Sequence, residues 1–238
     1  MTEATLIAER GTAKITRAEL KDVPSPEPTA THQPIPHYEV VALLIETLSF
    51  RHIYVKHDEY AVSANGMKLF GIMTLEEEFS GVNFAIGLRN SNDKSMRLAL
   101  TAGFRVIVCS NMAFHGDFLP ILHKHTPGLE LSEAISVGVD RIQRNFAPLK
   151  QQIIAWKDTD LYESQAKLII YRAFIEAGFP KQLMHSVHNN YFNPVQSEHW
   201  ERSLWGLSNA FTSAFKTLNP IAQFRMTARL AGFLPQFG

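Results

Sequence analysis

The chain has 238 residues, of which 45% are hydrophobic, and its 23 Lys and Arg residues balance its 23 Asp and Glu residues. A chain of this length and apolar content can bury a sizeable core, so we expect a globular protein. The zero formal net charge argues against a protein whose whole surface is basic, although it leaves room for a local basic patch.

Cysteine content and hydropathy indicate the cellular compartment of the protein. Cys109 is the only cysteine, so no intrachain disulfide can form, and its position after the apolar residues 106–108 favours an inert, buried thiol. No apolar run reaches the ~20 residues that a membrane span needs, and the first residues carry no apolar signal core. We therefore predict a cytoplasmic protein with no membrane partner.

The N-terminal segment is rich in proline. Missing amide donors and fixed φ angles suit an extended tether, so we predict that residues 1–36 form a flexible arm and residues 37–238 a single domain. The prolines that support the arm are Pro24, Pro26, Pro28, Pro34 and Pro36.

The first part of the domain, about residues 37–118, is predicted to be a helix followed by four or five antiparallel strands. Apolar residues at helical spacing indicate a helix over residues 38–49. Asn65-Gly66 between apolar runs predicts a hairpin turn. Alternating apolar residues over 82–88 and 98–108 predict a second hairpin with one dry face, and residues 91–95 supply its turn.

The second part, about residues 129–238, changes to a helical period. Eight apolar residues fall on one stripe of a long helix that Pro148 should kink or split; they are Leu131, Ile135, Val139, Ile142, Phe146, Leu149, Ile153 and Trp156. Asp160 and Glu163 resemble a capping box, Ser197 is a candidate cap for a third helix, and Pro220 should start a fourth. The whole domain is therefore predicted as α+β, with the sheet packed against a layer of long helices.

Three sequence blocks resemble a family found in phages and plasmids, domain of unknown function family 932. They are RNSNDKS at 89–95, RVIVCSN at 105–111 and SLWGLSNAFT at 203–212. The similarity spans roughly residues 37–230. The family usually has Arg-Asn-Ser-His-Asp-Gly-Ser in the first block, where this chain has Asn92 and Lys94 in place of His and Gly. The resemblance implies a mobile-element setting and a role in nucleic-acid metabolism or host conflict, but no reaction.

The same hairpin carries the candidate binding residues. Cations with neighbouring polar side chains suit contacts with phosphate oxygens, and the alternative is an ordinary solvated strand face. The long helix would add two cations three residues apart if it packs beside the hairpin. The predicted nucleic-acid-binding residues are Arg89, Asn90, Ser91, Lys94, Arg97, Arg105, Asn111, Arg141 and Arg144. Tyr54, Tyr60, Phe70 and Phe104 could stack on unpaired bases, although core packing is the favoured reading.

A histidine-rich segment offers a weaker hypothesis. His115, Asp117, His123 and His125 could hold zinc or manganese, but the spacing alone is unspecific and a polar loop is the commoner explanation. We therefore predict no metal and no cofactor.

No nucleophile elbow, phosphate-binding loop or dinucleotide fingerprint occurs in the sequence, so we name no catalytic residue, and an enzyme is the less favoured reading. The favoured function is binding of single-stranded DNA in phage or plasmid replication, recombination or DNA protection. One alternative is a protein-binding module that inhibits a host defence enzyme of the anti-restriction or anti-CRISPR type. A second alternative is a metal-dependent nuclease. A host or phage protein partner and self-association are left open.

Overall fold

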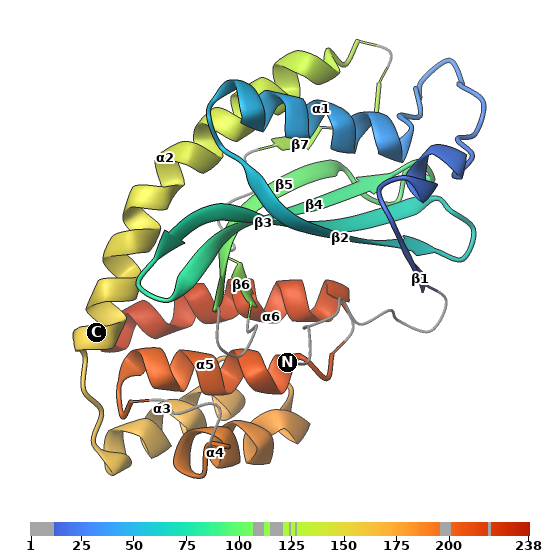
Figure 1. Ribbon diagram of the computed structural model, residues 1–238. Helices are drawn as coiled ribbons and strands as arrows, with labels where there is room; N and C mark the ends of the chain where they lie inside the picture. Colours follow the sequence, from blue (N-terminus) through green and yellow to red (C-terminus); the bar gives the residue numbers. More distant parts are fainter. Residues whose placement is uncertain are drawn as a thin grey trace.

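The computed structural model describes residues 12–106, 112–114, 121–123, 125–126, 128–195, 201–218 and 220–238. It is an α+β fold, as predicted, with an antiparallel sheet built by the first half of the chain and helices that come mostly from the second half. Figure 1 shows α1 and α2 along one side of the sheet, and α3 and α4 at the far end of the molecule from α1.

The sheet follows the chain order. Its strands are β1 (Thr12–Ile15), β2 (Val55–Ser63), β3 (Lys68–Phe79), β4 (Val82–Ser91), β5 (Leu98–Val106), β6 (Met112–Phe114) and β7 (Ile121–His123). From β1 to β6 each strand pairs with the next one in the sequence. The β7 strand also pairs with β5, at residues 98–100, whereas β6 pairs with residues 103–105 of β5. Every pairing is antiparallel, and short turns join β2 to β3, β3 to β4 and β4 to β5.

The predicted Asn-Gly hairpin is confirmed. Gly66 has φ +67°, a left-handed conformation that glycine adopts without strain. Asn65 Oδ1 accepts a hydrogen bond from the Met67 amide at 3.1 Å and from the Ser63 hydroxyl at 2.6 Å. The turn is therefore held by its own side chains and fixes the register of β2 against β3.

The β4–β5 hairpin has two covered faces rather than one. All residues of β4 are buried except Arg89, which is partly buried. One face carries the large apolar side chains and contacts α2, where the rings of Phe84 and Phe146 lie 4.6 Å apart. The other face carries small and polar residues, with Gly87 opposite Thr101 and Ala85 opposite Gly103.

The helices of the described chain are α1 (His37–Phe50), α2 (Leu131–Asp158), α3 (Glu163–Ile175), α4 (Met184–Phe192), α5 (Leu204–Phe215) and α6 (Pro220–Phe233). Short 3₁₀ helices are η1 (Glu19–Asp22), η2 (Lys181–Leu183) and η4 (Leu234–Phe237). The α2 helix buries its predicted stripe from Ile135 to Trp156, with Leu131 partly buried, and runs without interruption through Pro148, so proline does not split it. The α6 helix begins at Pro220, as the sequence indicates.

The predicted cap at Asp160 is wrong. Asp160 forms a β-bridge with Ser203 instead of capping α3, and the Tyr162 amide at the start of α3 donates to Gln165 Oε1 at 2.9 Å. The α5 helix is capped by Ser203, whose hydroxyl oxygen accepts from the Gly206 amide at 3.2 Å. Ser197 lies outside the described residues.

Part of the predicted arm packs against the domain. The β1 strand pairs with β2 at the sheet edge, and Leu20 and Ile35 belong to the hydrophobic core with 1% and 8% exposure. The described portion of the arm, from residue 12 onward, thus contributes a strand and core side chains, because β1 extends the sheet and the apolar side chains of Leu20 and Ile35 pack in the core. No helix in the described parts of the chain is long and apolar enough to cross a membrane.

Candidate functional site

The polar block at residues 89–95 forms the end of β4 and the turn that leads to β5. Arg89 lies directly opposite Phe70 on β3, whereas Asn90 lies opposite Leu69. Because successive strand residues point to opposite faces, the block sends Arg89 to the polar face of the sheet and Asn90 to the core face. Neighbouring residues of this short segment therefore lie on opposite faces of the sheet, one polar and one in the core.

Asp93 organises the turn itself. Its Oδ1 accepts hydrogen bonds from the Ser91 hydroxyl at 2.5 Å and the Ser95 amide at 3.0 Å, and Oδ2 lies 3.5 Å from Lys68 Nζ. Partial burial raises the pKa of Asp93, but the hydrogen bonds from Ser91 and Ser95 and the Lys68 charge outweigh it and hold the pKa well below its usual value. The negative charge in the turn is thus already compensated.

Three cations near this turn have no carboxylate partner in the described part of the chain. Arg89 is partly buried, its Nε makes no hydrogen bond to any described residue, and burial lowers the pKa of its guanidinium. Lys94 is exposed at the tip with φ +65°, and Arg97 is exposed directly before β5. We call Arg89, Lys94 and Arg97 together with Phe70 the hairpin-tip surface.

Arg105 belongs to a different set of contacts. Its guanidinium lies 3.9 Å from Glu59 Oε1 and donates to Thr74 Oγ1 at 3.4 Å, and the Arg105 and Glu59 side chains are only 13% and 14% exposed. Arg105 pairs with Asn83, six residues along β4 from Arg89, which places the two arginines about 20 Å apart at the usual rise per residue. A single small anion cannot contact both.

Asn90 has a structural role at the core face. Its amide Nδ2 donates to the Ile35 carbonyl at 3.1 Å and faces His37 Nδ1 at 2.9 Å. His37 Nε2 lies 2.9 Å from the Gly66 carbonyl, so Nε2 carries the proton and Nδ1 accepts from Asn90 in the neutral ring. Burial lowers the pKa of His37, in keeping with this neutral form. Asn90 thus ties β4 to the start of α1.

Two further histidines stack beside this contact. The rings of His32 and His125 are parallel, with centroids 5.6 Å apart. His32 Nδ1 lies 3.0 Å from the His125 carbonyl oxygen, and His32 Nε2 lies 3.1 Å from that of Asn92. Neither ring nitrogen of His125 has a hydrogen-bond partner among the described residues. Burial, followed by the nearby His32 and His37, lowers the pKa of His125 to about 4. We call His32, His37, Asn90, Asn92 and His125 the histidine–asparagine cluster.

The remaining predicted residues are spread over the fold. Asn111, His115 and Asp117 lie outside the described residues, and His123 is the last residue of β7. Arg141 and Arg144 are exposed on α2 beside Asp140, which accepts from Arg51 Nε at 2.6 Å just past the end of α1.

The hairpin and α2 cations are therefore separated. The α1 helix has 14 residues, and its first residue contacts the hairpin through His37 and Asn90. Its other end contacts α2 through Arg51 and Asp140. The two ends of α1 are about 20 Å apart, so the hairpin-tip surface and the α2 arginines lie toward opposite ends of this helix and do not form one compact patch.

The metal and aromatic hypotheses concern residues of which only some have described side chains. Across the described residues, no three His, Cys, Asp or Glu side chains are placed to hold a metal ion. Tyr60 and Phe104 are buried in the core, Tyr54 is 48% exposed, and Phe70 is partly buried beside Arg89.

Sequence reasoning missed the histidine–asparagine cluster. His32 lies in the proline-rich segment that was assigned to the arm and His37 is the first residue of the predicted domain, and their partners in the cluster lie 53 to 93 residues away along the chain. Local patterning carries no information about such distant pairs. The sequence signal that pointed to this region was the run of consecutive polar residues at 89–95, which include Asn90 and Asn92.

Comparisons with protein-family models, with curated proteins and with solved structures gave no match. The resemblance to family 932 stays a prediction based on the three sequence blocks.

Proposed function

We propose that the protein binds single-stranded nucleic acid, DNA being favoured, at the hairpin-tip surface. The observation that carries the proposal is the pair formed by Arg89 and Phe70, which lie directly opposite each other in the β3–β4 ladder. Arg89 is partly buried without a carboxylate partner among the described residues, and an aromatic ring lies beside it.

The guanidinium supports contact with phosphate. A partly desolvated arginine has lost some hydrogen bonds to water, and a phosphate oxygen restores them with a charge-assisted bond. Lys94 and Arg97 at the same end of the hairpin add two exposed cations, while the Asp93 charge is held by Lys68. Phosphate contacts of this kind supply most of the affinity for nucleic acid without reading its sequence.

The ring of Phe70 supports a single strand over a duplex. Opposite residues in an antiparallel pair have Cβ atoms about 5 Å apart. The Phe70 ring and the Arg89 guanidinium are therefore close enough to contact the same nucleotide. An unpaired base can stack on an aromatic side chain, whereas a base within a duplex is already stacked on its neighbours. A phage or plasmid setting, which the family resemblance implies, is part of this proposal.

The test is a salt titration of binding to a fluorescent single-stranded oligonucleotide of about 20 nucleotides, followed by anisotropy. Three phosphate contacts predict a log-log slope of affinity against salt of about −2, because each contact on a single strand contributes about −0.7. Arg89→Ala should reduce the slope by about 0.7, whereas Phe70→Leu should weaken binding by about 1–3 kcal/mol and leave the slope unchanged.

Two variants serve as controls. Arg144→Ala removes an exposed cation on α2, far from the hairpin, and should leave the slope unchanged. Asn90→Ala should lower the free energy of unfolding by about 1–3 kcal/mol, because it leaves buried groups of Ile35 and His37 unpaired. Absence of binding at low salt, or equal affinity for a matched duplex, would contradict the proposal.

A further inference from the structure

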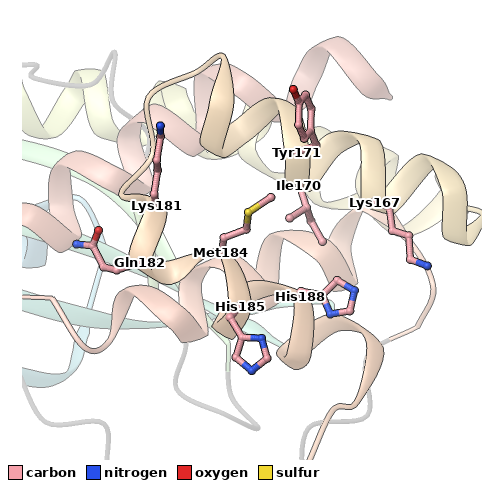
Figure 2. A pocket seen from close by; sticks show the side chains of 8 residues that line it. All are labelled: Lys167, Ile170, Tyr171, Lys181, Gln182, Met184, His185 and His188. Atoms are coloured by element: carbon pink, nitrogen blue, oxygen red, sulfur yellow. The ribbon is translucent and has the colours of Figure 1, made fainter.

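A second surface lies at the far end of the molecule, between α3 and α4. It is a groove of about 580 Å³ whose apolar lining includes Ile170 and Tyr171 from α3 and Met184 from α4. In Figure 2 the Met184 side chain extends into the space between the two helices, toward Ile170. We call this the α3–α4 groove.

The apolar surface continues beyond the groove along α3. Leu168, Tyr171 and Ile175 are 56%, 50% and 47% exposed, and Tyr162 at the start of the helix is 79% exposed. Spacings of three and four residues place Leu168, Tyr171 and Ile175 on one stripe of the helix. Since α3 has 13 residues, the stripe extends along a helix about 20 Å long, a length that suits a helix better than a compact small molecule.

The described residues that line the groove include two lysines and no acidic residue, and one of the lysines is paired with a glutamate just outside the lining. Lys167 and Lys181 lie at opposite ends of the groove in Figure 2, with His185 and His188 between them. Lys167 pairs with Glu163 at 2.5 Å, but Lys181 makes no ion pair with any described residue. Outside the groove, Arg172 and Glu176 neutralise each other at 2.8 Å.

We propose that the α3–α4 groove binds an acidic amphipathic helix of another protein. The apolar face of that helix would cover Ile170, Tyr171 and Met184, and its carboxylates would face Lys181 and the two histidines. A second copy of this chain suits the surface less well, because a symmetric contact would bring the Lys167 and Lys181 residues of two copies together. This inference is independent of nucleic-acid binding, since it uses none of the residues of the hairpin-tip surface.

The test uses two synthetic helical peptides of about 18 residues, or five turns, with the same leucine stripe. One carries glutamates on its remaining positions and the other carries lysines. We expect the full-length protein to bind the glutamate peptide at least about tenfold more tightly than the lysine peptide, by anisotropy at moderate salt. In methyl NMR spectra the Met184 and Ile170 signals should shift on addition of the glutamate peptide.

Variants locate the binding. Lys181→Glu should weaken the glutamate peptide about tenfold and strengthen the lysine peptide, and Tyr171→Ser should weaken both; each side chain is exposed, so folding should be unaffected. Arg225→Glu, a charge reversal at an exposed position on α6 outside the groove lining, is the matched control and should change neither affinity.

Three results would overturn the proposal: no binding of the glutamate peptide, binding that Lys181→Glu and Tyr171→Ser leave unchanged, or a dimer in sedimentation that Tyr171→Ser abolishes. The last result would assign the groove to a second copy of this chain.

Discussion

At the residue scale, the block at 89–95 combines two kinds of polar side chain that look alike in the sequence. Asn90 and Asn92 are buried, with 0% and 3% exposure, and bond to the segment that precedes α1. Arg89, Lys94 and Arg97 remain without carboxylate partners among the described residues. A buried amide stabilises the fold through its hydrogen bonds, whereas an unpaired cation is available to a ligand, so mutations should separate the two roles.

His125 should make the stability of the protein depend on pH. Its pKa is lowered to about 4 in the fold, against an ordinary value near 6.5, so the unfolded chain binds the proton more tightly. The contribution is complete above pH ~6.5 and is lost as the pH falls toward ~4, with about 2 kcal/mol lost at pH ~5. Urea unfolding at pH ~7.5 and ~5 measures the loss.

The variant His125→Phe isolates this effect, because it keeps a ring stacked on His32 and removes the titrating group. The difference between wild type and His125→Phe at the two pH values therefore reports His125 alone. Equal pH dependence in the two proteins would show that His125 is not buried in its neutral form.

At the element scale, the long α2 helix shows how packing outweighs local propensity. Its apolar stripe is buried from Ala134 to Trp156, whereas Pro148 lies on the exposed side. Proline lacks the amide that would donate to the carbonyl of the preceding turn, at a cost of ~3 kcal/mol. The burial on both sides of Pro148 keeps the helix continuous in spite of this loss.

Pro148→Ala should therefore stabilise the protein. The helix gains a hydrogen bond and loses a ring clash, and the greater freedom of the unfolded chain offsets part of the gain, which leaves about 2 kcal/mol in the free energy of unfolding. Chemical denaturation provides the measurement. Ala147→Gly, at the exposed neighbouring position, should lower stability by about 1 kcal/mol and shows that the site reports helix propensity. Unchanged stability in Pro148→Ala would mean that α2 does not form a regular helix there.

At the scale of the whole molecule, the chain from β1 onward packs around one connected core. Leu20, which precedes the predicted domain boundary, belongs to the same cluster as residues of the sheet and of α5. The β1 strand and the histidine contacts at His32 and His37 attach this segment at three further places. We therefore expect the described part of the N-terminal segment to unfold together with the rest.

Leu20→Ala tests this expectation. Leu20 is 1% exposed, so its replacement by Ala should lower the free energy of unfolding by about 2–5 kcal/mol, because transfer free energy is lost and a cavity is left behind. Unfolding should remain a single transition. Glu27→Ala, at an exposed position in the same segment, should change stability by less than about 0.5 kcal/mol. If Leu20→Ala is as mild as Glu27→Ala, residues 12–36 do not pack on the domain in solution.

The sequence by itself determined the features that depend on near neighbours. The stripe from Leu131 to Trp156 predicted α2, Asn65-Gly66 predicted the β2–β3 turn, and Pro220 marked the start of α6. Helix periodicity, turn geometry and capping act over three to seven residues, so a local pattern contains the information needed. Even there, the α4 helix and the cap at Ser203 were missed, because short elements depend on tertiary packing more than on propensity.

Tertiary structure alone decided which polar residues meet. Asn90 and His37 are 53 residues apart, His32 and His125 are 93 apart, and Arg105 contacts Glu59 across the sheet. Strand register decides whether Arg89 or Asn90 faces the core, since a shift of one residue exchanges the two faces. Burial is a property of the assembled sheet and helices, and therefore the division of one polar block into a structural part and a candidate binding surface appears only in the folded molecule.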